Sequence, residues 1–360
     1  MVKISKVSKN RCSMIACGLA YSNEHAFHFS ETTEKAISTT RAAICPYWPG
    51  GLMGSTMRKC GGIATAALMM TGMAAVQPAY ARQVVRVPCS APALVNAVAA
   101  ANQTGEGVLV LDTGCNYVLT APSATGRGPD GLLINADVEL IGGSGTQISR
   151  SATAAPFRII EVAAGAFLDL ENTTITGGLT NNTVPSNDTG GGILNSRGTT
   201  TLFRSTITGN TADNGAGLSN DSGRLDLNQS SINDNTTRAG GGGGGGVYND
   251  GALNMQNSVI RHNHANTNGG GLYNGQGGST ETVGSTVDLN TAGAQGGGVY
   301  NAPDGRLLLQ STNITLNSAT SGGGIFNAGL PSRVNLIASA VVSNTPNNCV
   351  PVGTIRHCTG

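Results

Sequence analysis

A short glycine-rich block recurs six times along the chain. Each copy places an aliphatic residue, a variable residue and an asparagine after three small residues, as in GGGVYN. The blocks end at Asn195, Asn220, Asn249, Asn274, Asn301 and Asn327, at intervals of 25, 29, 25, 27 and 26 residues. A nearly fixed period in this range is typical of a solenoid, in which one supersecondary unit stacks on copies of itself.

A second pattern, Ser/Thr-x-Ile/Val-x-x-Asn, lies between the glycine blocks and shares their period. Its β-branched anchors are Ile175, Ile207, Ile232, Ile260, Val287, Ile314 and Val341. Pairs such as Leu225 and Leu227 come seven and five positions before an anchor, with a polar residue between them. This alternation indicates short strands with one buried face. We therefore predict an all-β fold of parallel coils, stacked at the strand spacing of about 4.8 Å.

Both ends of the predicted solenoid carry features of caps. Ser90 and Pro92 begin a segment that places Leu94, Val98 and Ala101 on one face, which predicts a short amphipathic helix over the first coil. The repeat breaks after residue 345. We expect a cap and first coils at 82–130, β-helix repeats at 131–345 and a C-terminal cap at 346–360.

Four cysteines follow residue 81, and they lie in two pairs at the two ends of the array. An even number of cysteines in an exported chain favours disulfides. Of the three pairings, Cys89–Cys115 with Cys349–Cys358 needs no link across the whole array. A metal site is the alternative, but no C-x₂-C spacing or nearby histidine supports it. We predict two disulfides, no metal and no cofactor.

Residues 57–81 contain the three parts of a secretory signal peptide. A basic start at Arg58 and Lys59 precedes an apolar stretch and the sequence Ala-Tyr-Ala ending at Ala81. They predict cleavage near Ala81 and a bacterial protein that is secreted or held at the cell surface, with no transmembrane segment in the mature chain. A short membrane anchor is the alternative. We interpret residues 1–56 as an upstream extension from a misplaced start codon and expect no folded structure there; an unusually long signal is the other explanation.

Charge excludes some partners. From Arg82 onward the chain has 13 arginines, no lysine and 17 acidic residues, although the whole chain carries a formal charge of +1. A weakly acidic body without a basic stripe is a poor candidate for nucleic acid or for an anionic membrane. We therefore expect a glycan or a surface protein as partner.

The block-ending asparagines have a structural interpretation. Identical amides stacked at strand spacing form hydrogen bonds along the column and satisfy backbone groups of the turns. We predict this ladder for the six block-ending asparagines and for a second column: Asn210, Asn235, Asn263, Asn290, Asn317 and Asn344. Glycosylation at sequons such as Asn172 and Asn313 is the functional alternative.

The residue before each block-ending asparagine is expected to point outward, because the aliphatic residue before it points inward. These residues are Leu194, Ser219, Tyr248, Tyr273, Tyr300 and Phe326. The last four would form an aromatic row that binds sugar rings or a protein partner. Stacking of the side chains on one another is the structural alternative.

A catalytic alternative rests on outward carboxylates. Asp226 and Glu281 are expected two coils apart, about 9.6 Å by backbone spacing, near the upper limit for an inverting glycosidase pair. Arg224 is a nearby basic residue, and the absence of lysine from this part of the chain excludes a lysine base. Ordinary solvated side chains on the outer face of a strand explain the same pattern.

The chain resembles bacterial right-handed parallel β-helix proteins of the pectin-lyase-like fold. Within them it is similar to secreted sequences related to polymorphic outer membrane proteins, through its GGGILN and GGGLYN blocks, the STITGN run at 205–210, and VPCSAPALVNAV with DTGCNYVLT. The F-x-x-N motif of the chlamydial proteins is missing. The resemblance implies a right-handed parallel β-helix over residues 86–350 and does not choose a function. We expect an adhesin-like, non-catalytic protein; the alternative is a lyase or glycoside hydrolase acting on acidic polysaccharide.

Overall fold

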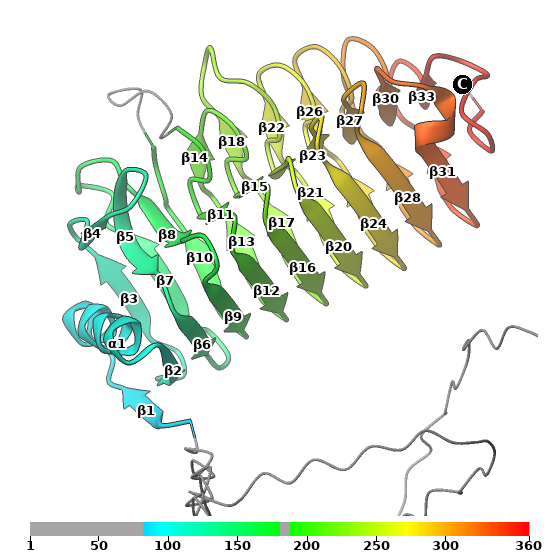
Figure 1. Ribbon diagram of the computed structural model, residues 1–360. Helices are drawn as coiled ribbons and strands as arrows, with labels where there is room; N and C mark the ends of the chain where they lie inside the picture. Colours follow the sequence, from blue (N-terminus) through cyan, green and yellow to red (C-terminus); the bar gives the residue numbers. More distant parts are fainter. Residues whose placement is uncertain (1–81, 181–187, 360) are drawn as a thin grey trace, which may run out of the picture. The chain divides into compact units, whose positions relative to one another are not determined.

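The computed structural model of the protein describes residues 82–180 and 188–359. The expected upstream extension at 1–56 and signal peptide at 57–81 lie outside the described residues. Within them the chain forms a parallel β-solenoid of coils about 27 residues long, which confirms the predicted all-β architecture. Figure 1 shows the strands of one sheet side by side from β2 to β31.

Each complete coil contributes one strand to each of three long sheets. The first, sheet A, contains β1 (Val84–Val87), β2 (Glu106–Leu111), β6 (Asp137–Ile141), β9 (Phe167–Glu171), β12 (Thr199–Phe203), β16 (Arg224–Asn228), β20 (Ala252–Gln256), β24 (Ser279–Val283), β28 (Arg306–Gln310) and β31 (Val334–Ile337). Sheet B contains β3 (Asn116–Leu119), β7 (Gln147–Arg150), β10 (Thr174–Thr176), β13 (Thr206–Thr208), β17 (Ser231–Asn233), β21 (Val259–Arg261), β25 (Thr286–Asp288), β29 (Asn313–Thr315) and β32 (Ala340–Val342).

The glycine blocks lead into the third sheet. Sheet C contains β4 (Ala124–Thr125), β5 (Pro129–Ile134), β8 (Arg158–Val162), β11 (Ile193–Ser196), β15 (Leu218–Asp221), β19 (Val247–Asn249), β23 (Leu272–Asn274), β27 (Val299–Asn301), β30 (Ile325–Asn327) and β33 (Cys349–Val350). A short fourth sheet between B and C contains β14 (Thr211–Ala212), β18 (Thr236–Thr237), β22 (His264–Ala265) and β26 (Thr291–Ala292). Among the described strands all pairs are parallel except β4 with β5.

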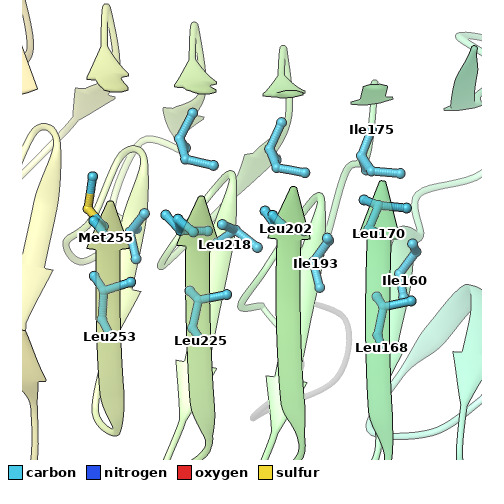
Figure 2. Close-up of a cluster of buried hydrophobic side chains, with 14 of the residues drawn as sticks. Ile160, Leu168, Leu170, Ile175, Ile193, Leu202, Leu218, Leu225, Leu253 and Met255 are labelled. Carbon is cyan, nitrogen blue, oxygen red and sulfur yellow. The ribbon is translucent and has the colours of Figure 1, made fainter. Parts of the chain in front are cut away.

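The core is a set of aliphatic rows that run along the solenoid. Every predicted anchor is buried, and anchors of successive coils are direct partners, such as Ile175 with Ile207. Leucines of sheet A face them, for example Leu168 and Leu170 on β9 (Figure 2). Each such side chain contributes about 1.5–3 kcal/mol when it is fully buried, so stacking coils builds one continuous core.

A left-handed residue marks the corner between sheets A and B in successive coils. Asn172, Arg204, Gln229, Asn257, Gly284, Ser311 and Ala338 occupy it with φ between +47° and +61°. Only one of these seven residues is glycine, the residue that adopts this conformation without steric cost. Asn172 and Asn257 also adopt it readily, so the stacking of coils imposes the corner on the other four residues.

The asparagine columns lie inside the corners of the coils. In the first column, Asn195, Asn220, Asn249, Asn274 and Asn301 each donate a side-chain hydrogen bond to the amide oxygen of the next asparagine, at 2.8–3.0 Å, ending at Asn327. The second column, from Asn210 to Asn344, forms the same contacts at 3.0 Å. All twelve side chains are buried. The amides thus satisfy polar groups that water does not reach.

The caps contain the expected helix and both predicted disulfides. Helix α1 (Ala91–Thr104) buries Leu94, Val98 and Ala101 against the first coils. Ser90 is the N-cap residue of this helix, as predicted, although its side chain forms no hydrogen bond to the helix. Disulfides join Cys89 to Cys115 at the start of the solenoid and Cys349 to Cys358 at its end, which confirms that pairing.

Candidate functional site

The aromatic row lies on the outward side of sheet C. Tyr248, Tyr273, Tyr300 and Phe326 are direct partners on β19, β23, β27 and β30. Successive ring centroids are 4.8, 4.8 and 5.6 Å apart, and adjacent planes deviate by 8°, 20° and 5°. Each ring is half-buried. The four rings therefore form one continuous stack.

This stack occupies the ring faces. Each inner ring has a neighbouring ring on both faces, so mainly ring edges and hydroxyl groups are left for solvent. Sugar binding by aromatic side chains uses a ring face, and the geometry instead favours the stabilising contacts between rings. Burial first, then the charge and hydrogen bond of Asp250, raise the pKa of the Tyr248 hydroxyl.

The equivalent residues of earlier coils share the outward register of the aromatic row but are covered. Leu194 and Ser219 are buried. The segment around Arg127 lies over this part of sheet C: its backbone N–H donates to Glu161 Oε2 at 2.7 Å, and its guanidinium binds Ser196 and Asp221. This segment precedes the glycine repeats, so the period gave no sign of it.

The structure brings Arg224, Asp226 and Glu281 into one shallow pocket of about 370 Å³ on the outer face of sheet A. Asp226 and Glu281 occupy the same row, separated by Asn254 on β20. Arg224 Nε lies 2.6 Å from Asp226 Oδ2, and Asn254 Nδ2 donates to the other carboxylate oxygen at 2.7 Å. Both oxygens of Asp226 thus have partners within the pocket.

A second pocket adjoins the first and shares Glu281 with it. It measures about 510 Å³ and is lined also by Arg306, Leu308 and Asn335, with a side wall from Leu330 and the 3₁₀ helix η1 (Pro331–Arg333). Arg333 in this wall is fixed by Asp304, whose backbone oxygen accepts at 2.9 Å and whose carboxylate lies at 3.2 Å. We call the outward side chains of β16, β20, β24, β28 and β31 that line the two pockets, together with Arg333, the sheet A strip.

Sequence reasoning identified only part of this strip. Asp226, Glu281 and Arg224 were found from the alternation of β16 and β24. Arg306 and Asn335 obey the same alternation but carry no catalytic signature, and Arg333 belongs to an irregular turn without a period. The common signal of Arg306 and Asn335 is the outward register, which becomes informative only once the side wall is known.

The described residues also contain a buried ionic cluster that sequence reasoning missed. Asp130 and Arg158 are 0% exposed, and Arg158 Nε lies 2.8 Å from Asp130 Oδ1, with Glu161 Oε2 3.9 Å from Arg158 Nη1. Burial raises the pKa of Asp130 to about 7, although the charge of Arg158 opposes this. The uninterrupted strand sequence RIIEV was the available signal. Because the three side chains are buried and the backbone N–H groups of Gly126 and Arg127 donate to Asp130 and Glu161, the cluster holds the segment around Arg127 rather than a ligand.

Two further findings concern the part of the chain that the structure describes. No group of three or more His, Cys, Asp or Glu side chains there is arranged to hold a metal ion. None of the helices described is long and apolar enough to cross a membrane.

Comparison with known proteins adds no relative. The chain matches no protein-family model, no curated protein and no solved structure.

Proposed function

We propose that the protein is a non-catalytic, adhesin-like β-helix that is secreted or held at the cell surface and binds a glycan along the sheet A strip. The observation that carries this proposal is the pair of adjoining pockets on one flat face. Their lining alternates amides, carboxylates and guanidinium groups, which donate and accept hydrogen bonds as sugar hydroxyls require. Successive strands present different polar groups at about 4.8 Å, in a row that also contains Leu308, so an extended chain meets hydrogen-bonding partners on several coils.

Two observations support the remaining parts of the proposal. The four cysteines that follow residue 81 form two disulfides, which fits an oxidising compartment outside the cytosol. This agrees with the predicted signal peptide. The contacts of Asp226 favour binding over catalysis, because its carboxylate already pairs with Arg224 and accepts a hydrogen bond from Asn254.

Retention on immobilised polysaccharides tests the proposal. We expect the full-length protein to be retained, and Asn254→Ala and Asn335→Ala, one in each pocket, to weaken retention together by at least tenfold. The matched control is Thr286→Ala, which removes a polar side chain from the outer face of sheet B. Equal retention of all variants would place binding elsewhere on the surface and refute the assignment to sheet A.

A lyase or hydrolase remains the second candidate, because Asp226 and Glu281 share a pocket and lie two strands apart, about 9.6 Å by strand spacing. Release of reducing ends or of unsaturated uronides from the same polysaccharides measures it. Activity that disappears in Asp226→Asn or Glu281→Gln would establish this second function in place of the first.

A further inference from the structure

The sheet A strip is electrically balanced. Arg224 pairs with Asp226 and Arg333 pairs with Asp304. The remaining charges that line the pockets are Glu281 and Arg306. With Asp304, which lies outside the pocket linings but pairs with Arg333, three arginines and three carboxylates balance, so the strip and this partner together carry no net formal charge for a ligand to neutralise.

The same face becomes acidic toward its N-terminal coils. Glu139, Asp169 and Glu171 project outward from β6 and β9, where Glu139 and Asp169 are direct partners. No arginine forms an ion pair with these three in the described part of the chain, which has no lysine. Burial, and then the charges of Glu139 and Glu171, raise the pKa of Asp169, as expected for carboxylates that face one another without a cation.

The acidic coils lie close to the pockets. Asp169 and Asp226 occupy the same row of sheet A, with Thr201 of β12 between them. Two strand spacings separate them by about 9.6 Å, roughly one Debye length at 0.1 M salt. A glycan that extends along the strip beyond β16 therefore approaches carboxylates whose field is only partly screened.

We infer that the sheet A strip selects uncharged polysaccharide and rejects chains built of uronic acids. The inference rests on the proposed function and names the ligand class for that site. Neutral sugar hydroxyls can form hydrogen bonds with the amides and with the ion-paired side chains of the strip, since a paired arginine still has N–H groups to donate. A uronate chain finds no cluster of unpaired cations in the strip. The carboxylates of the acidic coils repel it, which weakens its binding.

One polymer in two charge states tests this selectivity. The probes are pullulan and a soluble β-1,3-glucan, each used before and after oxidation of its free C6 hydroxyls to carboxylates; polymer taken through the same procedure without oxidant is the blank. We expect retention of the full-length protein on at least one neutral polymer and, at low salt, retention on its oxidised form weaker by roughly fivefold or more, from unscreened repulsion over about 10 Å. Salt should reduce this difference.

A charge variant identifies the cause. The triple variant Glu139→Gln, Asp169→Asn, Glu171→Gln lies outside the pockets, so retention on the neutral polymer should stay unchanged while retention on the oxidised form rises. Asp234→Asn, in a turn after sheet B, is the control for a general change in net charge. Oxidised polymer retained as well as the neutral form, or better, overturns this inference and leaves the proposed function standing. Failure to retain any probe in either form overturns both.

Discussion

Replacing Asn274 by alanine removes a central rung of the asparagine ladder. The Asn274 amide nitrogen donates to Asn301 Oδ1 at 2.8 Å and to the backbone oxygens of Gly278 and Arg306 at 3.1 Å. Its oxygen accepts from Asn249 Nδ2 at 3.0 Å and from the Thr280 hydroxyl at 2.8 Å. The side chain is 0% exposed, so water does not replace it without disturbing the coil.

The magnitude follows from these contacts. An amide has two hydrogens and an oxygen with two acceptor positions, so four of the five contacts act as full hydrogen bonds at one time. At about 1 kcal/mol net for each bond, with an added cost for groups left unsatisfied, we expect the free energy of unfolding to fall by about 3–5 kcal/mol. This is a large part of the 5–15 kcal/mol typical of a folded protein.

Urea denaturation followed by far-UV circular dichroism measures the loss. Asn313→Ala is the control, because Asn313 is exposed on β29 and makes no side-chain hydrogen bond within the described residues; it should change stability by less than about 0.5 kcal/mol. Since each coil contacts only its neighbours, amide exchange should accelerate first around β23 and β27. A loss below about 1 kcal/mol for Asn274→Ala would refute the idea that the ladder holds the coils together.

Three further predictions concern other parts of the solenoid. Tyr273→Ala should lower the free energy of unfolding by about 2–3 kcal/mol through two lost ring contacts, whereas Tyr273→Phe should stay close to wild type in the same urea titration; a glycan-retention defect with unchanged stability would contradict the structural role of the stack. The raised pKa of Asp130, about 7 against about 3.9 unfolded, makes the folded state bind the extra proton. The contribution of this proton to the free energy of unfolding is fully present below pH 4 and is lost as the pH rises through 7. Thermal melts should therefore show higher stability at pH 5 than at pH 8, and a weaker dependence of stability on pH in Asp130→Asn. A pH dependence unchanged by the substitution would assign the effect to another group. Ala338→Gly should stabilise by about 0.5–1 kcal/mol because it relieves a left-handed corner with φ of +48°, while Ala340→Gly, in strand β32, should destabilise; two losses in denaturant titrations would show that the corner is not strained.

The sequence predicts the repeated features well and the unrepeated ones poorly. The anchors from Ile175 to Val341 and both asparagine columns follow from spacing alone, because a period aligns equivalent residues in space. Spacing does not say what covers a surface, so the burial of Leu194 and Ser219 could not be foreseen. Alternation also placed the tyrosines correctly on the outward side, but their orientation depends on ring packing between coils, which only coordinates reveal.

The near-identity of the coils has a consequence for folding. Because each buried asparagine binds an equivalent asparagine in the next coil, a coil that skips one neighbour and pairs with the following one forms almost the same contacts. Such mispaired forms therefore differ little in energy from the correct one. The unequal intervals, from 25 to 29 residues between blocks, oppose such slips because a skipped coil would have to be accommodated as a loop outside the solenoid. The disulfide-bonded ends are the non-identical parts of the array. They therefore fix which coil is first and which is last. A gain or loss of one whole coil between them would preserve the contacts between neighbouring coils.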